Sequence, residues 1–391
     1  MKQDIQKVQQ YFKEESNDMK AFLKRLAEVE SPSRDVAAQA PVFAILENKF
    51  AEIGFTTNHF PGQQSGGYLI AKPEQRPKNA HLQMMIGHCD TVWSKGTLAN
   101  MPLEETNGML KGPGVFDMKA GLVQMLFALQ AIRDLGLTLK VTPVCLINSD
   151  EEIGSRDSTD AIRRLSKIAD RAYVLEPPLG LEGKLKTARK GLGRFTLKVK
   201  GIAAHAGLNP GDGASAILEL SHQIQHLFAF NDPKKGITVN VGMIEGGISP
   251  NVVAPESSAV IDVRVPTMED AFLVEEKILS LKPYLLNTKV EVEGGFGRLP
   301  MEKTQRNEKL WNAAQFIGHS IGIDLKDASA GGGSDANTTS FFTATLDGLG
   351  AIGDGAHANH EFVFLEKMQE RAALLVFLLL LPPIEPIHLN N

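Results

Sequence analysis

A buried-strand pattern that ends in three consecutive carboxylates constrains the fold of this chain more than any other feature. Residues 141–147 are apolar without alternation, which is typical of a parallel strand covered by helices on both faces. Asp150, Glu151 and Glu152 follow directly. Ligands of open α/β sheets bind beyond the carboxyl ends of the strands, so we expect a cleft here. Because adjacent carboxylates repel one another, either a bound cation neutralises them or they form a solvated acidic turn.

Metal-capable side chains recur where other apolar stretches end. Strands are predicted at residues 67–71, 82–87 and 172–175, and a glycine-rich loop at 111–121. The ends of these segments, the acidic stretch and the segment that follows the apolar residues 349–352 supply His88, Asp90, Asp117, Glu151, Glu152, Glu176 and His357. One such histidine or acid alone is more often structural, but seven on one sheet edge are hard to explain as helix caps. Imidazole and carboxylate ligands without thiolates favour an open, catalytic site for zinc or a similar divalent ion.

The length and the change of pattern indicate two domains. A chain of 391 residues is too long to fold around one hydrophobic core of average size. Helical spacing is predicted at residues 5–29, 36–53, 122–135 and 158–168. From residue 191 the pattern alternates, and residues 191–297 follow the strand–helix–strand–strand–helix–strand order of a ferredoxin-like unit. We therefore predict an α/β catalytic domain at 1–190 and 298–391, interrupted by an α+β domain at 191–297.

Composition excludes several classes of partner. A net charge of −5 provides no excess of positive charge for binding nucleic acid or an anionic membrane. The longest apolar run, 372–381, has ten residues, short of the roughly 20 that span a bilayer, and predicts a buried terminal helix. Cys89 and Cys145 lie in apolar, strand-like surroundings, which fits packed thiols in a reducing compartment. The polar N-terminus lacks the core of a signal peptide, so we expect a cytoplasmic protein.

Five ordered motifs resemble the M20 family of zinc-dependent exopeptidases and deacylases. They are His88-x-Asp90-Thr91-Val92, Gly114-Val115-Phe116-Asp117-Met118-Lys119, Asp150-Glu151-Glu152, Glu176-Pro177 and Gly355-Ala356-His357. Residues 88–96 and 331–335 look most like the glutamate carboxypeptidase branch of that family. The resemblance implies a phosphorylase/hydrolase-like zinc exopeptidase fold with an inserted ferredoxin-like lid and dimerisation domain.

The resemblance also implies roles at the metal site. It places His88 and Glu176 on one zinc ion, Glu152 and His357 on a second, and Asp117 between both. Cobalt and manganese are alternative ions. Glu151 matches the general base, and Asp90 matches the carboxylate that orients His88, which fits the general rule that a metal-bound imidazole donates its other N–H to an acceptor.

The inserted domain contributes further candidates by resemblance. His205 matches a histidine that reaches the partner subunit's site in a homodimer and stabilises the oxyanion, whereas without the resemblance it is a turn histidine capping the next helix. Asn251 and Arg264 match positions that hold the substrate's free carboxylate, although Asp262 could simply pair with Arg264. In the glycine-rich segment, the matching substrate-binding positions are Gly332 and Gly333.

The implied activity is hydrolysis of an amide bond beside a free carboxylate, which releases a C-terminal amino acid such as glutamate from a peptide or an N-acyl amino acid. A deacylase of N-acyl amino acids or a dipeptidase fits the same motifs, and Met118-Lys119 stands where the glutamate carboxypeptidase relatives vary. A phosphate or nucleotide binder built on residues 331–334 lacks a following Gly-Lys-Ser/Thr. A non-catalytic dimeric binding protein would require missing ligands, and the sequence retains them all.

Overall fold

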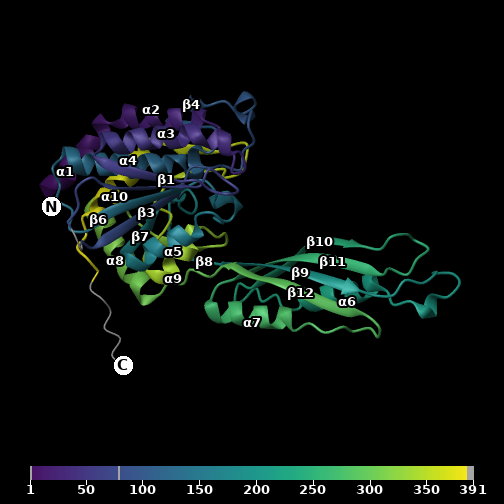
Figure 1. Ribbon diagram of the computed structural model, residues 1–391. Coiled ribbons are helices and arrows are strands. Elements are labelled where there is room, and N and C mark those ends of the chain that lie inside the picture. The colour runs from purple at the N-terminus through teal and green to yellow at the C-terminus, as the bar shows by residue number, and fades with distance from the viewer. Residues whose placement is uncertain (1, 78–79, 385–391) are drawn as a thin grey trace. The chain divides into compact units, whose positions relative to one another are not determined.

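The computed structural model describes residues 2–77 and 80–384. These residues form two compact units (Figure 1). The first unit comprises the chain up to residue 187, residues 303–329 and the chain from residue 334. The second comprises Ala188–Glu302 and Ala330–Gly333, so the segment that carries Gly332 and Gly333 groups with it.

The first unit is built on a six-stranded sheet in the order β1-β2-β6-β3-β7-β14. The central strands β6, β3, β7 and β14 run parallel, and β1 and β2 pair antiparallel at one edge. The strand bounds are β1 Phe55–Phe60, β2 Tyr68–Pro73, β3 Leu82–His88, β6 Thr142–Asn148, β7 Ala169–Val174 and β14 Ala344–Leu346. The predicted buried strands are thereby confirmed. The sequence did not predict β1, because this edge strand is largely exposed and carries mixed polar and apolar residues.

Helices cover both faces of this sheet. Helices α2, α4 and α10 pack together on one face, while α5, α8 and α9 contact β7 or β14 on the other (Figure 1). The bounds are α1 Lys2–Glu14, α2 Ser16–Glu28, α3 Val36–Glu52, α4 Ala120–Asp134, α5 Thr159–Ile168, α8 Gln305–Ser320, α9 Asp335–Phe342 and α10 Leu365–Leu379. The single helix predicted over 5–29 was wrong in one respect: the regular helix breaks at Glu15, although Phe12, Met19 and Leu23 still face the core.

The most apolar helical segment lies in the core of the first unit. Residues Val115–Asp134 are long and apolar enough to cross a membrane, but 94% of the apolar window is buried. Its backbone is also non-helical at Asp117 and Met118. The regular helix α4 has 15 residues and is therefore about 22 Å long, shorter than a bilayer core of about 30 Å. The predicted buried terminal helix is confirmed in α10, where Leu374 and Leu375 are fully buried.

A small antiparallel sheet joins two loops that are distant in sequence. Its order is β15-β16-β5-β4, with bounds β4 Glu104–Thr106, β5 Met109–Lys111, β15 Gly353–Asp354 and β16 Phe362–Phe364. The pairing of β16 with β5 holds the glycine-rich loop that follows β5 beside the loop between β15 and β16. A further two-stranded sheet pairs β8 Leu185–Arg189 with β13 Asp327–Ala330.

The second unit has the predicted ferredoxin-like topology. Its antiparallel sheet has the order β10-β11-β9-β12, and the chain passes through β9 Gly191–Lys200, α6 Ala216–Phe228, β10 Thr238–Gly246, β11 Glu256–Val265, α7 Met268–Leu279 and β12 Lys289–Arg298. One face of the sheet packs on the helices, and residues such as Phe195, Leu197 and Val263 are fully buried there. The alternating pattern of β9 follows from this one-sided core.

Candidate metal centre

Three adjacent strands deliver side chains to one edge of the large sheet. His88 is the last residue of β3, which lies between β6 and β7. Glu151 and Glu152 begin the 3-10 turn Glu151–Ile153 that follows β6, and Glu176 follows β7. Because β6, β3 and β7 are parallel, their carboxyl ends meet, and these four residues lie together.

Asp117 lies between two imidazole rings. Its Oδ1 atom is 3.1 Å from Nε2 of His88, and its Oδ2 atom is 3.5 Å from Nε2 of His357. The loops that carry Asp117 and His357 bend through left-handed backbone, with φ of 72° at Gly114 and 61° at His357. One carboxylate thus faces one histidine with each of its oxygens.

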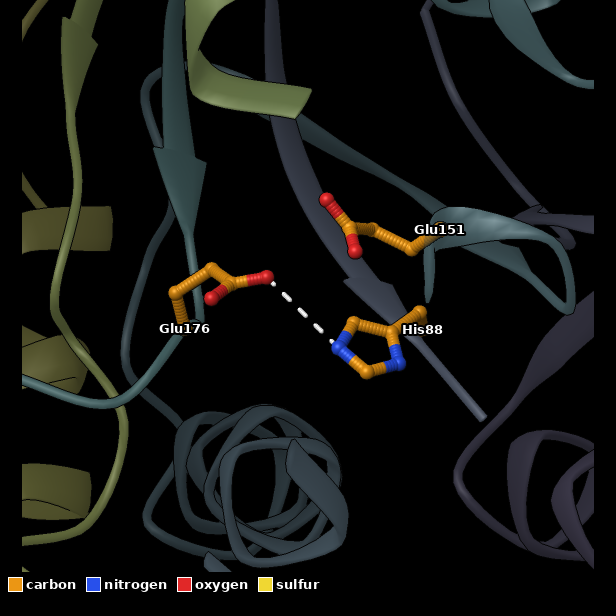
Figure 2. Close-up of side chains that lie close together, drawn as sticks. All are labelled: His88, Glu151 and Glu176. Atoms are coloured by element: carbon orange, nitrogen blue, oxygen red, sulfur yellow. Dashed lines mark ion pairs between the residues drawn. The ribbon is translucent and has the colours of Figure 1, made fainter. Parts of the chain in front are cut away.

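Each imidazole also faces a further carboxylate. Nε2 of His88 lies 3.6 Å from Oε1 of Glu176, and the carboxylate of Glu151 points toward the same ring (Figure 2). One ligand atom each from His88, Glu151 and Glu176 can lie within 4.8 Å of the others. On the other side of Asp117, Nε2 of His357 lies 3.1 Å from Oε2 of Glu152. The cluster therefore has two halves that share Asp117.

The donor set fits divalent cations. Nδ1 of His88 lies 3.0 Å from the carbonyl oxygen of Asp90, which can only accept, so this nitrogen carries the proton of the neutral ring. The lone pair of Nε2 then faces the carboxylates of Asp117 and Glu176, an arrangement that needs a proton or a cation between the groups. Nitrogen and carboxylate-oxygen donors at such spacing suit zinc or a similar ion.

The pKa shifts of the cluster residues also indicate that this site favours positive charge. Burial alone would lower the pKa of His88, but hydrogen bonds with Asp117 and Asp90 raise it well above its ordinary value. Hydrogen bonds with Asp117 and Glu152 raise the pKa of His357 to about 10. Burial raises the pKa of Glu152 to about 7. The cluster therefore retains protons at neutral pH, and a divalent cation can take their place.

Asp90 and Asp150 have different surroundings from the cluster carboxylates. Asp90 is fully buried and accepts the backbone N–H groups of Glu151 and Glu152, each at 3.3 Å. Asp150 turns away from the cluster and accepts from the hydroxyl of Ser158 at 2.7 Å. The expected acidic turn therefore directs only Glu151 and Glu152 toward the cluster, because Asp150 is buried and accepts from Ser158.

Sequence reasoning missed Glu361. This carboxylate is fully buried and accepts the backbone N–H of Asp117 at 3.1 Å. Its only sequence signal was its place four residues after His357, inside a stretch that holds two histidines. Cys89, in contrast, is a free buried thiol whose pKa is raised by burial, as the sequence indicated.

Two candidates of the second unit make the local contacts expected if they are purely structural, with His205 as a turn histidine and Arg264 as a partner of Asp262. Nδ1 of the exposed His205 accepts the backbone N–H groups of Gly207 and Leu208, each at 3.1 Å. Arg264 donates to Asp262 from Nε at 2.7 Å and from Nη2 at 3.1 Å. Their roles toward a metal site stay predictions.

The remaining candidates lie in loops of the same unit. Oδ1 of Asn251 accepts the hydroxyl of Ser249 at 2.6 Å. The carbonyl oxygen of Gly332 accepts from Nη1 of Arg189 at 3.0 Å. A Cβ atom at Gly333 would lie 2.5 Å from Cδ1 of Leu192, so a larger residue there would require the Leu192 side chain or the loop to shift. Their substrate-binding roles also stay predictions.

The parallel sheet, its metal-capable edge and the ferredoxin-like unit together define the architecture of a metal-dependent exopeptidase-type hydrolase. Residues 84–381 match the family model for peptidase family M20/M25/M40, and the chain belongs to this family of hydrolases.

Individual proteins are similar to this chain in sequence or in fold. Carboxypeptidase G2 of Pseudomonas sp. (strain RS-16) is 27% identical over 362 residues, which cover 89% of this chain and 85% of the relative. Aminopeptidase PepT of Bacillus cereus has a similar structure, with a TM-score of 0.77, 20% identity and coverage of 95% of this chain and 98% of that one. The YXEP protein of Bacillus subtilis, described as a dinuclear metal-binding peptidase of the M20 family, has a TM-score of 0.68 at 14% identity and covers 94% and 98%.

Proposed function

We propose that this chain is a di-metal carboxypeptidase that hydrolyses an amide bond beside a free carboxylate and releases a C-terminal amino acid such as glutamate from a peptide or an N-acyl amino acid. The observation that carries the proposal is the carboxylate of Asp117, whose two oxygens face two different imidazoles. The similarity to carboxypeptidase G2 supports the substrate class, and the dinuclear site named for the YXEP protein supports the two ions.

The ligands divide between the two ions. His88 and Glu176 would hold one ion, His357 and Glu152 would hold the other, and Asp117, which faces both imidazoles, would serve both. Zinc is the proposed ion, with cobalt and manganese as alternatives. When bound, such a pair polarises the scissile carbonyl and lowers the pKa of a water molecule.

Asp90, through its backbone carbonyl oxygen, and Glu151, through its carboxylate, act beside the ligands. Asp90 fixes the tautomer and orientation of His88, because its carbonyl oxygen lies 3.0 Å from Nδ1. Glu151 is the general base: it takes a proton from the attacking water and passes it to the nitrogen of the leaving amine. Its place next to Glu152 in the turn after β6, with its carboxylate directed toward His88, supports this role (Figure 2).

The second unit supplies the groups for substrate recognition. Because Nδ1 of His205 accepts two backbone N–H groups, the proton of the neutral ring is on Nε2, which can donate to the oxyanion. Arg264 and Asn251 hold the free carboxylate of the substrate, together with the loop at Gly332 and Gly333. In this role the substrate competes with Asp262 for the guanidinium of Arg264.

A homodimer would complete this arrangement through the edge strand β10. Met243 and Ile244 on β10 are 62% and 64% exposed, and the nearby Ile248 is 74% exposed. An uncovered edge with apolar side chains is stabilised when it pairs across a two-fold axis. We propose that His205 then serves the metal site of the partner subunit.

A substrate panel tests the proposal. The zinc-, cobalt- and manganese-loaded protein is given N-acyl-glutamate, other N-acyl amino acids and dipeptides, each with a free C-terminal carboxylate or with the matched carboxamide. We expect hydrolysis only with the free carboxylate and fastest release from N-acyl-glutamate. Preference for neutral N-acyl amino acids or for dipeptides would favour the deacylase or the dipeptidase instead, and equal cleavage of carboxamides would contradict the proposed recognition.

A further inference from the structure

Glu361 forms a dense set of contacts beside the metal centre. Its Oε2 atom accepts from Nε1 of Trp93 at 2.8 Å and from the backbone N–H of Gly114 at 2.9 Å. Its Oε1 atom accepts from the backbone N–H groups of Phe116 at 2.9 Å and Asp117 at 3.1 Å. All four side-chain hydrogen bonds that the structure describes therefore come from N–H donors, which suits a carboxylate that only accepts.

These contacts join three segments that carry proposed ligands. Trp93 follows the end of β3 at His88, the loop of residues 112–117 carries Asp117, and Glu361 lies in the loop that carries His357. Main-chain bonds support the same junction, because the backbone N–H of Gly112 donates to the carbonyl of Glu361 at 3.1 Å. A single buried side chain thus contacts all three segments, in addition to the main-chain pairing that holds two of the loops together.

The contact to Asp117 is the most direct of the four. Because Glu361 holds the backbone N–H of Asp117 itself, a shift of the Glu361 carboxylate moves the residue that would bridge the ions. Metal–ligand distances tolerate changes of only about 0.2 Å. In Glu361→Gln the amide nitrogen, which only donates, would face two of the four N–H groups, and these groups would have to move away from it.

We propose that Glu361 is a positioning residue that sets the placement of Asp117 relative to His357 and thereby the affinity of the centre for divalent ions. The inference rests on the two-ion site of the proposed function. It adds a residue outside the proposed ligand set, whose side-chain hydrogen-bond partners among the described residues are N–H groups of the loop and of Trp93.

Glu219 provides a matched control. It is also a fully buried carboxylate that accepts backbone N–H groups, from Tyr284 and from Leu285 at 2.7 Å, but it lies in the second unit. The variants Glu361→Gln and Glu219→Gln therefore make the same chemical change in two places. Any general cost of losing a buried carboxylate appears in both.

The experiment measures zinc binding to metal-stripped protein by calorimetry, together with the Tm of the metal-free form. We expect Glu361→Gln to weaken at least one of the two binding steps by about 10- to 100-fold, the usual effect of losing a residue that orients ligands. Glu219→Gln should lower the Tm while both zinc affinities stay at the wild-type values. Unchanged zinc affinities in Glu361→Gln, or an equal loss in Glu219→Gln, would overturn the inference.

A milder variant covers the case in which Glu361→Gln does not fold. Trp93→Phe removes only one donor to Glu361, and we expect a several-fold loss of zinc affinity with a Tm near that of the wild type. Wild-type zinc affinity in Trp93→Phe would then overturn the inference. Failure of the proposed function is distinguishable, because in that case the wild-type protein itself would bind fewer than two ions.

Discussion

Nδ1 of His88 lies 3.4 Å from Oδ1 of Asp90, and both side chains are almost completely buried. The carboxylate of Asp90 also accepts the backbone N–H groups of Glu151 and Glu152. Asp90 therefore connects the end of β3 to the turn that follows β6. The relationship explains how a histidine and two acids from different strands keep a fixed geometry.

Replacement of Asp90 tests this connection. An asparagine keeps the shape but cannot accept with both side-chain atoms, so Asp90→Asn should lower metal affinity or turnover about 10- to 100-fold. Asp157→Asn is the control, because Asp157 accepts from the backbone of Gln64 and Ser65 outside the cluster. Equal effects of the two variants in metal-binding and rate measurements would show that Asp90 has no special role.

Glu151 should matter for rate and not for metal binding. The variant Glu151→Gln removes the proposed base without changing its size, and we expect turnover to fall by about 10²-fold or more, as is usual for acid–base catalysis. Elemental analysis should give the wild-type metal content. Full activity would move the base to another residue, and loss of an ion would make Glu151 a ligand.

Metal binding should release protons. In the metal-free protein the pKa of His357 is raised to about 10 and that of His88 is also raised, so both rings are protonated at neutral pH. An ion must displace these protons, and metal affinity should therefore decrease as the pH falls from about 8 to about 6. Calorimetry in buffers of different ionisation enthalpy measures the protons released. An affinity independent of pH would contradict the proposed ligand set.

The ease of prediction differed between parts of the molecule for physical reasons. The proposed ligands His88, Glu152 and Glu176 were recognisable because each stands near the end of an apolar strand, and parallel strands bring such ends together. Glu361 was not recognisable, because its partners are backbone N–H groups of a loop about 245 residues away, which leave no side-chain pattern. The break at Glu15 was also hidden, since the apolar spacing continues through it.

Subunit mixing tests the proposed role of His205. If His205 acts in the partner's site, His205→Ala should be nearly inactive while its own ions stay bound. Mixing it with inactive Glu151→Ala under subunit exchange leaves one site of each heterodimer intact. Random exchange makes half the dimers mixed, so activity should recover to about a quarter of the wild-type value.

Recovered activity is informative only in samples in which exchange of subunits has been confirmed. Mass measurement of differently labelled chains establishes that heterodimers have formed. Background activity in a sample with such heterodimers would place His205 in its own subunit's site or outside catalysis, and a monomeric protein would remove the basis of the proposal.

Stepwise titration of the metal-stripped protein with zinc tests the central claim most directly. Bound zinc and release of glutamate from an N-acyl-glutamate are followed in the same samples. The two halves of the cluster around Asp117 predict that two equivalents bind per chain and that full turnover requires both. Saturation at one equivalent with full turnover, or turnover without added ion in protein shown to be metal-free, would contradict the account.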